Sequence, residues 1–146
     1  EHESIDIPVL HVFNWPDHRT VSSETTSKLV EIIESKVAEK QAFYEEMRHP
    51  VLSETEKMLP VMHCKAGVGR TGQTIAALAM SKYPELSLES ITKDLRVSRN
   101  DRMIQTPYQM KTLVKLHAMN DMESMHTEAK QQTSRWWRSI FRKAKA

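Results

Sequence analysis

The chain has 146 residues, a hydrophobic content of 39% and a formal net charge of +2, so it is long enough for one buried core. Its single cysteine excludes an intramolecular disulfide and favours a reducing compartment. No run of about 18 apolar residues indicates a membrane-spanning helix, and seven histidines without paired ligand spacing imply neither a metal nor another cofactor.

The first predicted element is a strand that leads into a short acidic motif. Residues 7–13 form an apolar run typical of a strand, and Trp15-Pro16-Asp17-His18 follows it. Pro16 restricts the backbone of the turn and so gives a defined shape to the loop that carries Asp17. The alternative is an ordinary surface turn, in which Pro-Asp is common.

A long helix is predicted next along the chain. Ser22 or Ser23 is typical of its start, and His49-Pro50 would end it. Its apolar face would consist of Leu29, Ile32, Ile33, Val37 and Tyr44.

The most informative stretch is residues 63–72, which contains all three glycines and the only cysteine. Residues 59–62 before it are typical of a short buried strand, and residues 74–80 after it are typical of a helix. A glycine-containing loop from a strand to a helix N-terminus binds anions, because free N–H groups and the positive end of the helix dipole point into it. The sequence therefore predicts a phosphate-binding loop here.

Cys64 and Arg70 lie at the two ends of this loop. Amide dipoles and a nearby cation would lower the pKa of the Cys64 thiol, and the planar guanidinium of Arg70 could hold two phosphoryl oxygens. A thiolate beneath a phosphoryl group is placed for in-line attack. Thr71 could donate a hydrogen bond to the sulfur, and His63 would orient the loop. The five phosphate-binding residues between the ends are Lys65, Ala66, Gly67, Val68 and Gly69.

The alternative for this stretch is a buried cysteine beside a glycine turn. A nucleotide-binding P-loop is excluded because the sequence contains no G-x-x-x-x-G-K-[ST] motif.

A glutamine segment follows further along the chain. Thr106 and Pro107 are typical of an N-cap and a first helical residue. Gln105 would lie at the entrance of this helix and Gln109 one turn inside it, so that both amides could reach the loop. A solvated position is the alternative for Gln109. Arg96 and Arg99 are expected to brace the phosphate-binding loop through its carbonyls, and an exposed helix charge is the alternative for Arg99.

Residues 63–72 match the signature H-C-x-A-G-x-G-R-[ST]-G at every fixed position, so the chain resembles the cysteine-dependent protein tyrosine phosphatases. The resemblance covers about residues 5–118 and is greatest for the bacterial secreted enzymes of the Yersinia and Salmonella type. It implies that Asp17 is the general acid and later the base, on a mobile loop with Trp15 and Pro16 at its hinge. It also implies that Gln105 and Gln109 position the hydrolytic water.

The same resemblance implies an α/β fold, a twisted mixed β-sheet flanked by helices. Residues 1–120 would be the C-terminal part of a catalytic domain, whose N-terminal half, with the substrate loop, would be missing. We therefore expect an incomplete sheet with exposed apolar edges at residues 7–13 and 61–63, and marginal stability. Phosphotyrosine-containing proteins would be the substrates, reached by secretion from a bacterium into the host cytoplasm.

A basic, aromatic tail is predicted at residues 121–146. Residues 129–146 carry six basic and no acidic side chains, which leaves 15 basic against 19 acidic residues elsewhere. As a helix, residues 131–146 would present an aromatic face and a cationic face, a pattern that suits an anionic membrane surface. A tail that is disordered or folded onto the domain is the alternative. Nucleic-acid binding is disfavoured because no aromatic platform accompanies the charge elsewhere.

Three functions compete on the sequence alone. Hydrolysis of phosphotyrosine in proteins through a cysteinyl-phosphate leads. A dual-specificity or phosphoinositide phosphatase is the second enzyme, supported by Lys65, although such relatives lack the tryptophan loop. The third is a non-catalytic phosphotyrosine-binding remnant or a membrane adaptor. The intact Cys64, Arg70, Asp17 and Gln105 argue against it, and the expected absence of the substrate loop argues for it.

Overall fold

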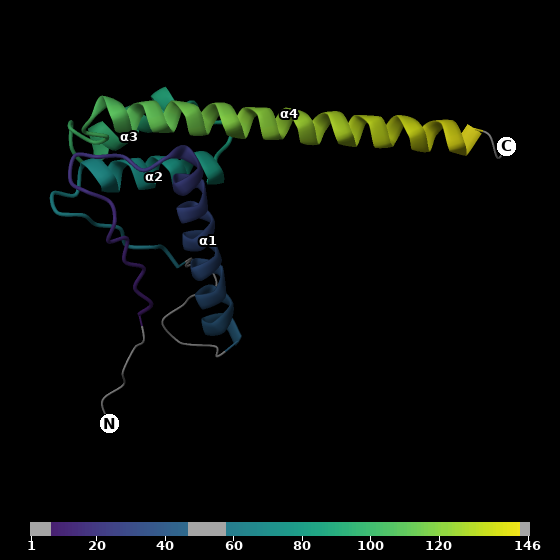
Figure 1. Ribbon diagram of the computed structural model, residues 1–146. Coiled ribbons are helices and arrows are strands. Elements are labelled where there is room, and N and C mark those ends of the chain that lie inside the picture. Colours follow the sequence, from purple (N-terminus) through teal and green to yellow (C-terminus); the bar gives the residue numbers. More distant parts are fainter. Residues whose placement is uncertain (1–6, 47–57, 144–146) are drawn as a thin grey trace.

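The computed structural model describes the backbone of residues 7–46 and 58–143 and the side chains of all but the last eleven of these. Four helices follow one another along the chain: α1 (Ser23–Glu46), α2 (Gly69–Lys82), α3 (Leu88–Ser98) and α4 (Pro107–Lys143). Helix α2 lies at the centre and packs against the other three (Figure 1).

Three of the helices begin at a hydroxyl that caps a free backbone N–H group. The Oγ atom of Ser22 accepts the N–H of Thr25 at 3.1 Å, so α1 begins where the sequence predicted. The Oγ atom of Ser87 caps α3 in the same way. Helix α4 starts at Pro107 after the predicted N-cap Thr106, which confirms that prediction.

The hydrophobic core lies around α2, whose Ala76 and Ala77 are fully buried. Only the first turns of α1 contribute to this core, and the rest of α1 runs away from the body (Figure 1). None of the five residues of the predicted apolar face of α1 is fully buried: Ile32 is 44% exposed and the other four are half-buried, whereas the helix buries Val30. The predicted end of this helix at residues 49–50 lies outside the described residues. The other buried core residues are Val30, Leu78, Met80, Ile91, Ile104, Leu113 and Leu116.

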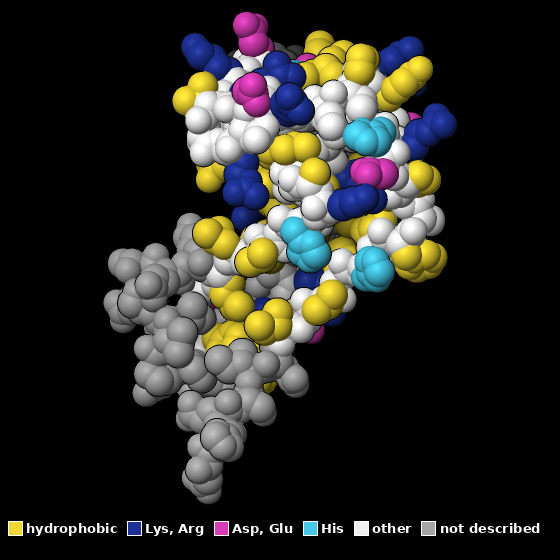
Figure 2. Space-filling model, turned by 90° about the vertical axis from the view of Figure 1, so that its left-hand side faces the viewer, with side chains coloured by type: hydrophobic (Ala, Val, Ile, Leu, Met, Phe, Trp, Pro, Cys, Tyr) yellow, Lys and Arg dark blue, Asp and Glu magenta, His cyan; other side chains and the backbone are white. Residues whose placement is uncertain are grey.

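The predicted α/β fold with a twisted mixed sheet is wrong for the described part of the chain, which contains no strand. Residues 7–13 and 59–62 are irregular, and Val9 and Val61 expose 86% and 93% of their surface. Figure 2 views this side of the molecule and shows hydrophobic side chains at its surface. A strand needs a neighbour that takes up its N–H and C=O groups, and no described segment pairs with either run.

The C-terminal half of α4 extends beyond the helical body as a single rod (Figure 1). Its backbone stays helical as far as Lys143, so a large part of the predicted basic tail is a continuation of this helix. Among the described helices, none combines the length and the apolar character that crossing a membrane requires.

Candidate active site

The cysteine loop, residues 63–68, leads directly into the N-terminus of α2. Val68 occupies the N-cap position without a side-chain hydrogen bond to the helix, and the first turn of α2 contains no acidic residue. The N–H groups and the positive end of the helix dipole are therefore left to the loop. Gly67 has a φ of +72°, a left-handed conformation that favours glycine, so this residue allows the loop to turn.

Cys64 lies half-buried in this loop as a free thiol. Burial by itself raises the pKa of the thiol, but hydrogen bonds from the Thr71 hydroxyl and from the amides of Thr71, Gly67 and Ala66 outweigh it. They lower the pKa of Cys64 from 9.0 to about 7. The Thr71 hydroxyl is buried and has no other partner among the described residues, so its proton is available to the sulfur. A large fraction of Cys64 is therefore thiolate at neutral pH.

The guanidinium of Arg70 is bound to the Trp15–Arg19 loop. Its Nη1 donates to the carbonyl of Trp15 at 2.8 Å, and its Nη2 pairs with Oδ1 of Asp17 at 3.0 Å. The Nε atom of Arg70 is buried and has no partner among the described residues. The hydroxyl and amide groups around Cys64, and not this guanidinium, are thus the main groups that lower the pKa of the thiol.

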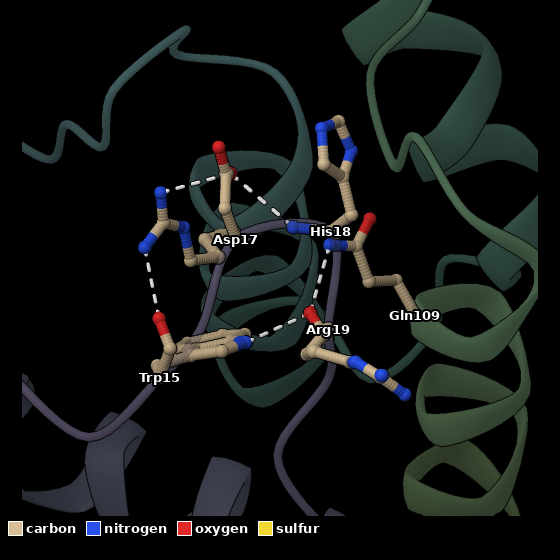
Figure 3. A network of polar contacts seen from close by, with 6 residues as sticks. Trp15, Asp17, His18, Arg19 and Gln109 are labelled. Carbon is tan, nitrogen blue, oxygen red and sulfur yellow. Dashed lines mark hydrogen bonds and ion pairs between the residues drawn. The ribbon is translucent and has the colours of Figure 1, made fainter.

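The shape of the Trp15–Arg19 loop is held by two hydrogen bonds to the carbonyl of Arg19 (Figure 3). Trp15 is 5% exposed, and its Nε1 donates to this carbonyl at 2.9 Å. Nε2 of Gln109 donates to the same oxygen at 3.2 Å. His18 has a φ of +56°, so the backbone turns sharply next to Asp17. The structure therefore brings Asp17 to Arg70 through a loop tied to α4.

Both glutamines lie beside the first residue of α2. A Cβ atom added to Gly69 would lie 3.0 Å from Nε2 of Gln109 and 3.1 Å from Oε1 of Gln105. Gln109 is fully buried, and its Oε1 accepts the N–H of Thr106 at 3.1 Å. The alternative of a solvated Gln109 is wrong, and the two amides reach the end of the cysteine loop as the sequence suggested.

The remaining predicted residues take more peripheral positions. His63, Lys65 and Ala66 are exposed, as is Pro16 in the Trp15–Arg19 loop, which we call the acid loop because it carries Asp17. Arg96 donates its Nε to the carbonyl of Met103 at 3.2 Å, so it braces the glutamine segment and not the cysteine loop. The guanidinium of Arg99 lies beside Gly67.

A buried polar network that the sequence did not reveal fixes the end of the acid loop. The Oγ1 atom of Thr20 contacts Oε1 of Gln73 and Oγ1 of Thr112, both at 2.9 Å. Nε2 of Gln73 donates in turn to Oγ1 of Thr26 at 3.0 Å. These contacts join the loop to α2, α4 and α1. The available signal was Gln73 itself, a polar residue directly before a predicted core helix.

Comparison with known proteins places these residues within one family. The family model of the protein-tyrosine phosphatases matches residues 1–119. The chain is 40% identical over 116 residues to tyrosine-protein phosphatase YopH of Yersinia enterocolitica, which covers 78% of the chain and 25% of that protein. It is 40% identical over 121 residues to secreted effector protein SptP of Salmonella typhi, which covers 83% of the chain and 20% of that protein. The chain thus spans a quarter or less of these relatives.

Proposed function

The chain belongs to the protein-tyrosine phosphatase family, and we propose that it hydrolyses phosphotyrosine in proteins through a cysteinyl-phosphate intermediate. The observation that carries this proposal is the thiol of Cys64, whose pKa is about 7, at the open N-terminus of α2. A thiolate in that position is a nucleophile next to a site for the phosphoryl oxygens.

In the first step the Cys64 thiolate attacks phosphorus, and the bond between phosphorus and the tyrosine oxygen breaks. Asp17 gives its proton to the departing phenolate oxygen. The loop amides hold the non-bridging oxygens. Arg70 can join them when its Nη2 leaves Asp17, because Nε has no other partner and the two groups then form a fork towards the phosphoryl group. The bond from Nη1 to Trp15 can persist meanwhile and keep the loop closed.

In the second step a water molecule attacks the phosphorus of the cysteinyl-phosphate. Asp17, now a carboxylate, takes the proton from this water, and the amides of Gln105 and Gln109 orient it. Thr71 donates a hydrogen bond to the sulfur as the phosphorus–sulfur bond breaks. The position of both amides beside Gly69 supports this assignment.

Turnover of a small aryl phosphate tests the proposal directly. We expect Cys64→Ser to abolish turnover and Asp17→Ala to lower kcat by about 10²- to 10³-fold, the usual weight of a general acid. For a phosphate monoester whose leaving group has a low pKa, Asp17→Ala should lower kcat by a smaller factor. Equal rates for the wild-type chain and both variants would refute the mechanism.

The partners of the chain follow from the same proposal. Phosphotyrosine-containing proteins are the substrates, and a role as a bacterial secreted effector is supported by the likeness to SptP. We also propose that the upstream half of the family's domain pairs with residues 7–13 and 59–62, which is supported by the exposure of Val9 and Val61. Co-expression of the two parts should raise turnover above that of this chain alone, and equal turnover would contradict the pairing.

An anionic membrane surface is a second proposed partner, bound by residues 131–146. Its support is the absence of acidic residues beyond position 128 together with a helix that runs to Lys143 away from the body (Figure 1). Sedimentation with vesicles that contain phosphatidylserine should require residues 131–146. Equal binding to neutral vesicles would argue against an electrostatic contact.

A further inference from the structure

The first turn of α2 contacts the segment that carries Ile104 and Gln105. At this contact, position 72 of α2 has no room for a side chain. A Cβ atom added to Gly72 would lie 2.6 Å from the backbone nitrogen of Ile104, closer than the 3.0 Å below which real Cβ contacts are essentially never found. Any larger residue must therefore push the two segments apart. Glycine within a helix costs about 1 kcal/mol relative to alanine, so close approach, not helix stability, explains this residue.

A hydrogen bond holds the two segments at this distance. The carbonyl of Val68 accepts the N–H of Ile104 at 3.2 Å, in addition to the N–H of Gly72 at 3.1 Å. Val68 is the last residue before α2, so the backbone of Ile104 is bound directly to the end of the cysteine loop.

Ile104 is strained in this position. Its φ of +60° is left-handed, which costs a β-branched residue about 1–2 kcal/mol. The side chains of Met103 and Ile104 are 0% and 3% exposed, and their burial holds the backbone in this conformation. Strain of this kind persists where the surrounding structure fixes it, often at functional sites.

We propose that Gly72 is a positioning residue that sets the distance between the cysteine loop and the two glutamines. Gln105 follows Ile104 directly, and its amide lies beside Gly69 together with that of Gln109. A shift of Ile104 therefore moves the groups that orient the attacking water, while Cys64 stays in place. The inference rests on the proposed phosphatase mechanism and concerns its second step: water attack slows, and formation of the cysteinyl-phosphate does not.

The test uses the full chain with an aryl phosphate in the presence of ethylene glycol. The cysteinyl-phosphate can pass its phosphoryl group to water or to the glycol, and the ratio of the two products measures how well water is positioned. In Gly72→Ala we expect the burst of released phenolate to stay within about twofold and the ratio of glycol phosphate to inorganic phosphate to rise at least about threefold.

Ala77→Gly is the matched control. This substitution weakens the same helix by about 1 kcal/mol without changing the contact with Ile104. We therefore expect Ala77→Gly to give the same product ratio as the wild-type chain. A burst with an unchanged ratio in Gly72→Ala would overturn the positioning role. The absence of a Cys64-dependent burst in the wild-type chain would instead overturn the phosphatase function and, with it, this role.

Amide hydrogen exchange tests the contact without turnover. The Ile104 amide should exchange about tenfold faster in Gly72→Ala, whereas the amides of the later turns of α2 should not. Unchanged exchange at Ile104 would overturn the steric argument. If Gly72→Ala loses its helical signal, Ile104→Gly offers a second test, because it keeps the N–H group and frees the backbone. That variant should also raise the product ratio, and the wild-type ratio would count against the proposal.

Discussion

The two apolar segments on either side of the cysteine loop have opposite surroundings. Helix α2 buries Ala76 and Ala77 completely, whereas Val61, before the loop, exposes 93% of its surface. A helix makes its backbone hydrogen bonds internally and needs only side-chain packing, while a strand depends on a neighbour for both. The parts of the site that lie on helix ends are therefore well fixed within this chain. The apolar runs that lead into Trp15 and Cys64 have no pairing partner among the described residues.

Truncating one residue from each region should give the largest difference. Leu113 is fully buried in α4, and Leu113→Ala should lower the free energy of unfolding by about 2–5 kcal/mol through lost burial and a cavity. Val61→Ala should change it by less than about 0.5 kcal/mol, because Val61 makes little contact. Urea denaturation followed by circular dichroism measures both. If the two variants lost similar free energies of unfolding, Val61 would be buried in solution, and the two regions would not differ in burial.

The polar network at the end of the acid loop is a second well-packed region whose contribution to stability can be measured. Gln73→Ala removes one hydrogen bond from each of the hydroxyls of Thr20 and Thr26, which keep their contacts with Thr112 and with the Ser22 carbonyl. The loss of these two hydrogen bonds should lower the free energy of unfolding by about 1–3 kcal/mol. Gln132→Ala is the matched control on an exposed turn of α4 and should have almost no effect. An equally small effect of Gln73→Ala would show that the network does not fix the loop.

The thiol of Cys64 tests whether the helix end is complete without the neighbouring segments. Since its pKa is about 7, the rate of alkylation by iodoacetamide should rise through a midpoint near pH 7 as the thiolate forms and level off above it. Thr71→Ala removes the main hydrogen bond that lowers the pKa of this thiol, so the midpoint should move upward. Thr74→Ala should leave it in place, because this hydroxyl donates to the carbonyl of Arg70.

The same pKa has a consequence for stability. A thiol whose pKa is lower in the folded state stabilises that state when it is ionised, so this contribution is present above pH 9 and is lost as the pH falls through about 7. The difference in unfolding free energy between the wild-type chain and Cys64→Ser should therefore shrink as the pH falls from 9 to 6. A constant difference would contradict the lowered pKa.

The local features of the fold could be predicted from the sequence. The starts of α1 and α4 depend on hydroxyls within three residues of the N–H groups that they cap, and both predictions were confirmed. The prediction of a sheet was wrong because an apolar run indicates only that its side chains are suited to burial. It contains no information on whether another strand is within reach to pair with residues 7–13 or 59–62.

In the candidate site, too, the local features could be predicted from the sequence and the contacts between distant segments could not. The cysteine loop is a continuous motif, so Cys64 and its amide donors could be placed from spacing alone. The contacts of Gln73 with Thr20 and of Gly72 with Ile104 join segments far apart in the chain, and no local pattern indicates them. The ion pair of Asp17 with Arg70 was also not foreseen, because the sequence assigned the guanidinium to the phosphoryl group.

That ion pair gives the smallest effect and the most specific one. Asp17 competes with an anion for Nη2 of Arg70, and a partly exposed ion pair of this kind is worth about 0–1 kcal/mol. Asp17→Ala should therefore bind inorganic phosphate up to about fivefold more tightly, measured as protection of Cys64 from alkylation at fixed pH. Glu85→Ala removes an equal charge from an exposed site and should leave the protection unchanged. If Asp17→Ala binds phosphate no better than this control, Arg70 does not have to leave Asp17 to bind the anion, and the first step proposed for the mechanism needs another account of how the guanidinium is freed.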